Sequence, residues 1–113
     1  MRSFILAAAV AAIATPSLAE DTTWLLPEPG LYCPVGADVM PISIREDGGV
    51  GIDSLDCERV RLEGGMVLSP SCVSNGGNRV VYQTDLRVLP SGGMIHDGVT
   101  FRRLGGRPPC PAG

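Results

Sequence analysis

Glycine pairs divide this chain at regular intervals and leave little room for a helix. Five Gly-Gly pairs begin at positions 48, 64, 76, 92 and 105, so they are 16, 12, 16 and 13 residues apart. Glycine adopts the positive φ angles that tight hairpin turns require. Beyond position 19, no ten-residue stretch that lacks Gly and Pro also has a helical period. The spacing therefore predicts short strands joined by tight turns.

The segments between these turns are short and apolar, as expected for strands. The predicted strands cover residues 31–33, 39–45, 50–52, 59–62, 66–69, 79–89, 94–96 and 99–104. Alternation is clearest over residues 79–89, where Val80, Tyr82 and Leu86 fall on one face and Val81 and Gln83 on the other. One buried and one half-exposed face are typical of an antiparallel sheet. We expect an all-β fold, a small antiparallel meander of about seven or eight short strands, barrel-like or a sandwich.

The first nineteen residues have the layout of a secretory signal peptide. Arg2 supplies a positive charge, residues 4–14 are uniformly apolar, and Ser17 and Ala19 are the small residues that a signal peptidase reads. The apolar stretch is too short for a membrane-spanning helix, which needs about 20 residues. We therefore expect cleavage before Glu20, a periplasmic or secreted protein, and no membrane insertion of the mature chain.

The remaining chain suggests one small domain with two flanking segments. We expect an extended N-terminal segment at 20–29, a β domain at 30–104 and a Gly/Pro-rich tail at 105–113. These residues carry eight arginines, no lysine and twelve acidic side chains, a net charge of −4. Nucleic acids and anionic membranes are bound by basic surfaces. We therefore expect no nucleic-acid partner.

Four cysteines in an exported chain predict two disulfides. Cys57 and Cys72 lie at equal distances from the centre of the glycine pair at 64–65. A hairpin that turns at this pair places the two cysteines opposite each other, near the Cβ separation of a disulfide. Cys33 and Cys110 then bond to each other, and Cys110 ties the tail to the first strand. No C-x-x-C motif occurs and there is one histidine, so we predict neither a redox motif nor a zinc site.

No cluster of residues in the sequence indicates catalysis, a metal or a cofactor. His96 is the first candidate for acid–base chemistry. It precedes Asp97-Gly98, a typical tight turn, so we expect a solvent-exposed histidine at a hairpin tip that is dispensable for function. Asp53, Asp56 and Glu58 form the densest acidic group, which we expect to be solvated turn residues and not a cation site. The sequence therefore predicts a protein that is not an enzyme, with no cofactor and no metal.

Trp24, Leu25 and Leu26 are three consecutive large apolar residues just before Pro27 and Pro29. The prolines restrict this segment to extended shapes. In one interpretation, Trp24 folds back as a lid on the barrel. In the other, Trp24, Leu25 and Leu26 form an exposed arm that docks into a partner protein, because Trp is enriched among interface hot spots.

Several short motifs resemble those of small periplasmic proteins of Gram-negative bacteria that carry a signal peptide and two disulfides. The matching pieces are Gly30-Leu31-Tyr32-Cys33, Gly51-Ile52-Asp53 through Cys57, then Cys72 and Phe101-Arg102-Arg103. More remotely, the layout is similar to the periplasmic inhibitors of lysozyme and of metalloproteases, which are small disulfide-bearing β-barrels. The characteristic residues of those inhibitors are absent, so the resemblance implies a fold and a compartment.

Small size, disulfides and the lack of catalytic motifs favour a non-enzymatic binding function. We expect an exported protein-binding module, such as an inhibitor of an envelope hydrolase, with an envelope or extracellular protein as partner. One alternative is a structural or stress-related envelope protein without a discrete site. The other is a small hydrolase, which a pocket with polar groups around His96 would favour.

Overall fold

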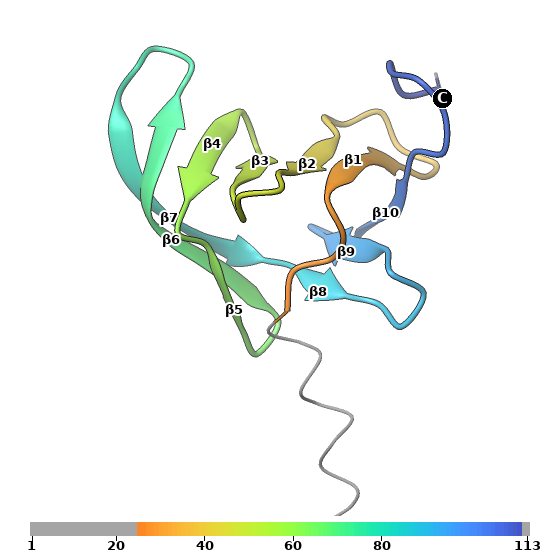
Figure 1. Cartoon of the computed structure of the whole chain (residues 1–113), viewed down its shortest axis with the longest axis horizontal. Coiled ribbons are helices and arrows are strands. Elements are labelled where there is room, and N and C mark those ends of the chain that lie inside the picture. The colour runs from red at the N-terminus through yellow and green to blue at the C-terminus, as the bar shows by residue number, and fades with distance from the viewer. Residues whose placement is uncertain (1–24, 112–113) are drawn as a thin grey trace, which may run out of the picture.

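Ten antiparallel strands form one curled sheet (Figure 1). The computed structural model describes residues 25–111, and no helix occurs among them. The strands are β1 Gly30–Pro34, β2 Ile42–Ile44, β3 Val50–Ile52, β4 Leu55–Glu58, β5 Arg61–Glu63, β6 Met66–Ser74, β7 Arg79–Asp85, β8 Arg87–Val88, β9 Met94–His96 and β10 Val99–Arg103. The all-β antiparallel class is as predicted, with ten strands in place of seven or eight. Over the described part of the chain, no helix is long and apolar enough to cross a membrane.

β7 and β8 lie at the two ends of the curled sheet and are consecutive in the chain. Neighbouring strands follow the order β5-β6-β4-β3-β2-β1-β10-β9-β8, and β7 pairs with β6. Leu86 alone separates β7 from β8. Its N–H donates to the Gly65 carbonyl over 2.9 Å, and its side chain is buried in the core. The sheet is therefore a half-barrel whose two ends are linked through this one residue.

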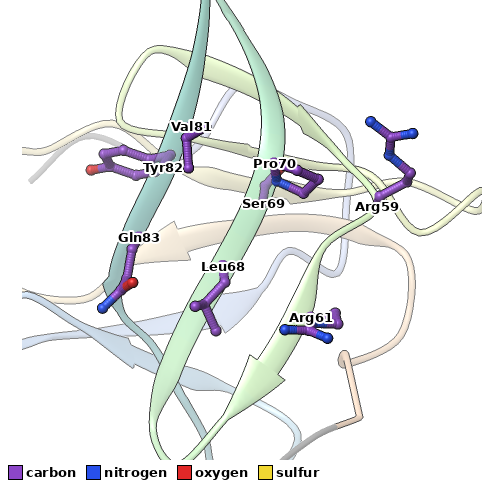
Figure 2. A pocket seen from close by; sticks show the side chains of 8 residues that line it. All are labelled: Arg59, Arg61, Leu68, Ser69, Pro70, Val81, Tyr82 and Gln83. Carbon is purple, nitrogen blue, oxygen red and sulfur yellow. The ribbon is translucent and has the colours of Figure 1, made fainter.

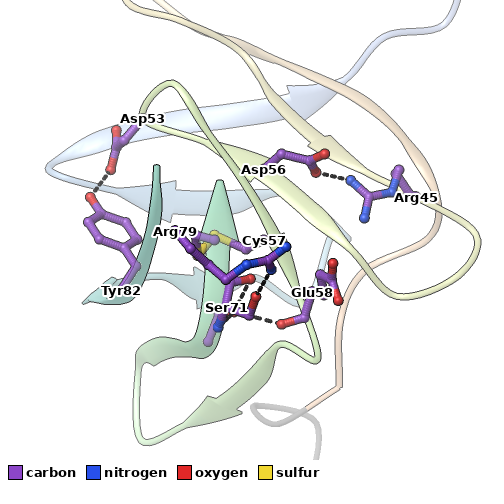
Figure 3. Close-up of a disulfide and its surroundings, with 10 residues drawn as sticks. Arg45, Asp53, Asp56, Cys57, Glu58, Ser71, Arg79 and Tyr82 are labelled. Carbon is purple, nitrogen blue, oxygen red and sulfur yellow. Dashed lines mark hydrogen bonds and ion pairs between the residues drawn. A yellow bond between two sulfur atoms is a disulfide. The ribbon is translucent and has the colours of Figure 1, made fainter. Parts of the chain in front are cut away.

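A bend in β6 lets this strand pair with three others. Pro70 and Ser71 together oppose the single residue Val81, so the register with β7 shifts by one residue, as in a β-bulge. Proline has no N–H and cannot continue a central ladder. The buried Ser69 hydroxyl donates to the Glu58 carbonyl over 2.6 Å and accepts from the Ser71 N–H over 3.1 Å (Figure 3). These bonds replace the ladder bonds that the bend removes.

Three of the differences from the predicted strands arise where the chain turns or breaks at a residue other than glycine. Residues 55–58, predicted as a connection, form β4, because Asp53 and Ser54 both take positive φ angles of 51° and 66° and make a hairpin turn. Arg59, at φ 52°, separates β4 from β5, so the predicted strand at 59–62 begins too early. The predicted strand at 79–89 is likewise divided at Leu86 into β7 and β8.

One register about Gly64-Gly65 fixes the first disulfide. Both glycines have positive φ, and the β5–β6 and β4–β6 ladders share the register that this turn sets. Cys57 therefore lies directly opposite Cys72 and is bonded to it, with Cα atoms 3.9 Å apart. Cys33 of β1 is bonded to Cys110, with Cα atoms 5.6 Å apart. Both pairs are those that the sequence predicts.

The hydrophobic core lies inside the curl of the sheet and surrounds the Cys57–Cys72 bond. Its members are buried strand residues that alternate along the chain, together with both cysteines of this bond and Leu86. They are Tyr32, Ile42, Ile44, Val50, Ile52, Cys57, Leu62, Val67, Cys72, Leu86, Met94 and Phe101. Leu26, from the N-terminal segment, packs against this cluster.

The Cys57–Cys72 bond should contribute strongly to stability. We expect the Cys57→Ala/Cys72→Ala double variant to lose about 3 kcal/mol of unfolding free energy, because the loop that this bond closes is entropically restricted in the unfolded chain. Urea unfolding monitored by circular dichroism measures the loss, with peptide mapping to show that Cys33–Cys110 is intact. A loss below about 1 kcal/mol would mean that native-state strain cancels most of the entropic gain.

Candidate functional site

His96 is the buried member of a partly exposed polar cluster at the seam of the half-barrel. It ends β9, and 6% of its surface is exposed. Its Nδ1 atom lies 2.7 Å from the Asp85 carbonyl oxygen at the end of β7, and its Nε2 atom lies 3.0 Å from the Asp53 carboxylate in the β3–β4 turn. The Tyr82 hydroxyl donates to the same carboxylate (Figure 3). The predicted solvent-exposed histidine is therefore wrong.

The turn that follows His96 is nevertheless the one that the sequence predicts. Asp97 and Gly98 have positive φ angles of 53° and 78° and connect β9 to β10. His96 precedes this turn on the inward face of its strand. The Asp97 N–H donates to the Asp85 carboxylate over 2.8 Å, which holds the turn against the end of β7. The tertiary packing of β7 against this turn is what buries the imidazole.

The contacts of His96 favour its protonated form. A carbonyl oxygen and an ionised carboxylate both accept hydrogen bonds, so both ring nitrogens must carry a proton to satisfy them. Burial lowers the pKa of His96, but the hydrogen bonds to the Asp85 carbonyl and the Asp53 carboxylate, with the charges of both aspartates, outweigh it and raise the pKa above its ordinary value. Burial and the bond to Asp53 also raise the pKa of Tyr82, which keeps its hydroxyl as a neutral donor.

These contacts are better suited to holding parts of the sheet together than to catalysis. A general base needs a ring nitrogen that can reach a substrate proton. Both nitrogens of His96 contact protein oxygens from two other parts of the sheet. The cluster therefore fixes the end of β7, the β3–β4 turn and β9 to one another.

The predicted acidic group is divided among separate partners. Asp53 contacts His96 and Tyr82, whereas Asp56 forms an ion pair with Arg45 (Figure 3). Among residues 25–111, no three acidic, histidine or cysteine side chains lie close enough to hold a metal. Asp53, Asp56 and Glu58 are all exposed, as the sequence predicts, and Asp53 in the β3–β4 turn also contacts the buried His96.

An open hollow lies on the outer face of β5, β6 and β7, and the sequence analysis did not predict it. Figure 2 shows Leu68 and Pro70 of β6 beside Val81 and Gln83 of β7, with two arginines on the other side. The hollow has a volume of about 460 Å³ and is lined by Arg59, Arg61, Leu68, Ser69, Pro70, Val81, Tyr82 and Gln83. We call it the outer groove. Val81 is 78% exposed there, the highest exposure among the exposed large hydrophobic residues of the described chain.

One signal for the outer groove was present in the sequence. Val81 is an apolar residue on the more polar face of the alternating segment 79–89, which is the face expected to point away from the core. The neighbours that form the groove come from β6 and from Arg59 and Arg61, and only the strand order brings them beside Val81. Alternation alone therefore could have identified the exposed valine but not the groove.

The N-terminal candidate segment is divided in the structure. Leu25 is 57% exposed, whereas Leu26 packs against the core. Trp24 lies outside the described residues, as do the predicted signal peptide at 1–19 and its cleavage site before Glu20. The structure thus describes the anchored end of the segment at Leu26 and leaves the lid and arm interpretations of Trp24 as predictions.

The protonated state of His96 should make stability depend on pH. Because folding raises the His96 pKa, its stabilising contribution is complete below the unfolded pKa of about 6.5 and is lost as pH rises through the folded pKa. We expect the unfolding free energy to fall as pH is raised from about 6 toward 9. Urea unfolding at a series of pH values measures this dependence.

Two variants serve as controls for this prediction. His96→Gln should remove the decline across this pH range, and Asp53→Asn should lower the His96 pKa that NMR titration reports, because the carboxylate that favours the imidazolium is gone. A wild-type protein that gains stability over the same range would show that His96 is neutral in the folded state.

Two features therefore remain as candidates for function: the outer groove, which is open to a partner, and the His96 cluster, which is satisfied within the fold. The groove offers apolar surface beside positive charge, whereas the cluster offers no unoccupied ring nitrogen. No protein-family model, no curated protein and no solved structure matches this chain, so the geometry and chemistry of these features alone support a proposal.

Proposed function

We propose that this chain is an exported, non-enzymatic protein-binding module that holds a partner in the outer groove. The observation that carries the proposal is the apolar surface that half-buried Leu68 and exposed Pro70 and Val81 form on a strand pair. Contiguous apolar surface with a polar rim is typical of protein interaction sites. Two disulfides among the described residues are in keeping with export to an oxidising compartment.

The charges around the outer groove suggest the chemistry of the partner. Arg59 and Arg61 border the apolar surface, and Arg61 forms an exposed ion pair with Glu63 over 3.1 Å. Among residues 25–111, Arg59 forms no ion pair with a carboxylate. A partner loop with an apolar side chain and a neighbouring carboxylate would complement this arrangement. We therefore propose an acidic, apolar loop of an envelope or extracellular protein as the ligand.

The position of the groove favours rigid recognition. It covers the bulge at Pro70 and Ser71, next to the disulfide that joins β4 to β6. A surface that is already ordered loses little conformational entropy on binding. An inhibitor of an envelope hydrolase is one concrete form of such a module, in line with the resemblance to small periplasmic inhibitors.

The contacts of His96 support a role without catalysis. It is the one histidine of the chain, and both of its ring nitrogens contact oxygens of the fold. A hydrolase that used His96 as a base would first have to break one of these buried contacts.

A substitution within the groove tests this proposal. We expect Leu68→Asp to weaken partner binding by at least about tenfold, because it places a charge in the apolar surface and beside the carboxylate of the proposed ligand. The partner is captured by cross-linking from a periplasmic extract, identified, purified and titrated by calorimetry. Val39→Asp is the matched control, since Val39 is 46% exposed and does not line the groove.

Two results would contradict the proposal. One is equal affinity of the Leu68→Asp and Val39→Asp variants for the captured partner. The other is catalytic turnover of a substrate by the purified protein that is lost in His96→Gln, because the module is proposed to have no catalytic residue.

The N-terminal segment offers a second partner contact. Leu25 is exposed and Leu26 packs against the core. In the arm interpretation, Trp24 contacts the partner just before this anchor. Trp24 is the only tryptophan, so its fluorescence reports on this segment alone. We expect iodide to quench this fluorescence strongly in the isolated protein and weakly in the complex. Strong protection in the isolated protein would favour the lid interpretation.

A further inference from the structure

His96 is the only side chain of this protein whose ordinary pKa lies near neutral pH. Imidazole is the side chain that titrates between about pH 5 and 8, and the sequence contains a single histidine and no lysine. All four cysteines are in disulfides, so none can form a thiolate. The pKa of Tyr82 is raised from an ordinary value of about 10. Between about pH 6 and 9, the side-chain charge of the fold therefore changes at His96.

A neutral imidazole cannot keep both contacts of His96. It carries one N–H, whereas the protonated ring carries two. Both of its partners are acceptors: the Asp85 carbonyl oxygen lies 2.7 Å from Nδ1, and the Asp53 carboxylate oxygens lie 3.1 and 3.0 Å from Nε2. Loss of one ring proton therefore leaves a nitrogen lone pair facing an oxygen, and one of the two contacts is lost.

The other groups around the ring do not compensate for the lost proton. The Asp85 carboxylate lies 3.6 Å from Nδ1 and is a further acceptor, and it already accepts from the Asp97 N–H. On β10, the Phe101 ring is uncharged, and its centroid lies 6.3 Å from that of the imidazole. The charges that act on His96 are therefore the carboxylates of Asp53 and Asp85, and both favour the protonated ring.

Both contacts of His96 hold β7, the strand that forms one wall of the outer groove. The Asp85 carbonyl belongs to the last residue of β7. The Asp53 carboxylate accepts from the Tyr82 hydroxyl in the middle of the same strand (Figure 3). Tyr82 and its two neighbours in the strand line the groove (Figure 2). Whichever contact a neutral ring loses, β7 loses one of its two connections to His96 of β9.

We propose that His96 regulates the outer groove: the groove binds its partner when the ring is protonated and releases it when the ring is neutral. The inference rests on the proposed function, because it concerns the same groove. When His96 makes both contacts, β7 presents its groove residues in one arrangement. A loosened β7 has to be ordered as the partner binds, and this ordering lowers the affinity. Protonation and partner binding therefore favour each other.

A pH titration of the isolated protein tests the connection between His96 and the groove without any partner. We expect the backbone amide signals of Val81, Tyr82 and Gln83 to shift between about pH 6 and 9 with the same NMR midpoint as the His96 ring. The Gly48 amide, in the β2–β3 turn, is the reference and should not follow this midpoint. Groove amides that do not follow the His96 midpoint would overturn the proposal.

Partner affinity should fall as pH rises through the titration of His96. Calorimetry with the captured partner should show at least about fivefold weaker binding at about pH 9 than at about pH 6, the lower end of usual coupling between two sites. Because linkage is reciprocal, saturation with the partner should raise the His96 pKa that NMR reports. His96→Gln has no ring proton to lose, so its affinity should be the same at both pH values. An equal pH dependence in the wild type and in His96→Gln would contradict the proposal.

Asp53→Asn is expected to preserve binding at high pH. Asparagine has the same shape, keeps an acceptor oxygen for the Tyr82 hydroxyl and offers an N–H that can donate to the neutral Nε2 of His96. The neutral ring then keeps both contacts, so this variant should bind the partner at about pH 9 as the wild type does at about pH 6. A damaged fold would not produce such a gain.

Asp56→Asn is the matched control for this variant. The Asp56 carboxylate pairs with Arg45 and not with His96, so its removal should leave the loss of affinity at high pH as in the wild type. A loss in Asp53→Asn as large as that in Asp56→Asn would overturn the proposal.

Failure of the regulation and failure of the proposed function give different results. Partner binding that Leu68→Asp does not weaken would contradict the groove as the binding site, whatever the pH. Binding that Leu68→Asp weakens, but that does not depend on His96 at any pH, would overturn the regulation and leave the proposed function standing.

Discussion

Pro70 interrupts the one strand that pairs with three others, and the rest of the sheet depends on how this interruption is accommodated. On one edge of β6, the pairing passes from β5 to β4 across the break at Arg59. On the other edge, the bulge at Pro70 and Ser71 keeps β7 in register on both sides of the bend. The Ser69 hydroxyl bonds to two backbone groups at this bend, the Glu58 carbonyl and the Ser71 N–H. Beyond this bend, β7 continues through Leu86 into β8 at the other end of the sheet.

A second set of contacts, the partly exposed cluster around His96, holds the end of β7, the β3–β4 turn and β9 together. His96 joins β9 to the carbonyl of Asp85 and to the carboxylate of Asp53, which lies 43 residues away in the chain. Asp53 takes a positive φ angle, a conformation that non-glycine residues adopt at some cost. The ion pair and the Tyr82 hydroxyl hold this turn in place. His96 is buried while the Asp53 carboxylate is partly exposed, so the imidazolium is the charge that would be left without a partner if this turn moved away. The cluster therefore defines which turn meets which strand.

The functional proposals depend on the contrast between the two sides of the β6–β7 hairpin. Its inner side carries the disulfide and the core residue Val67, whereas its outer side exposes Val81 and places half-buried Leu68 beside two arginines. A strand pair held on one side and left open on the other presents an accessible face. This face suits a partner loop that supplies an apolar side chain and a carboxylate.

Local backbone preferences determined much of this fold from the sequence alone. The glycine pair at 64–65 set the hairpin that brings Cys57 to Cys72, and the alternation over 79–89 assigned the faces of β7 correctly, because both depend on residues close together in the chain. The strand at 55–58, the break at Leu86, the burial of His96 and the outer groove were decided by tertiary structure. Each depends on which strands lie side by side, and a turn such as Asp53-Ser54 carries no glycine to reveal it. The signal peptide and Trp24 remain predictions from sequence. What a side chain at a strand end contacts is decided by the strand that packs against it, since alternation specifies a face and not a neighbour.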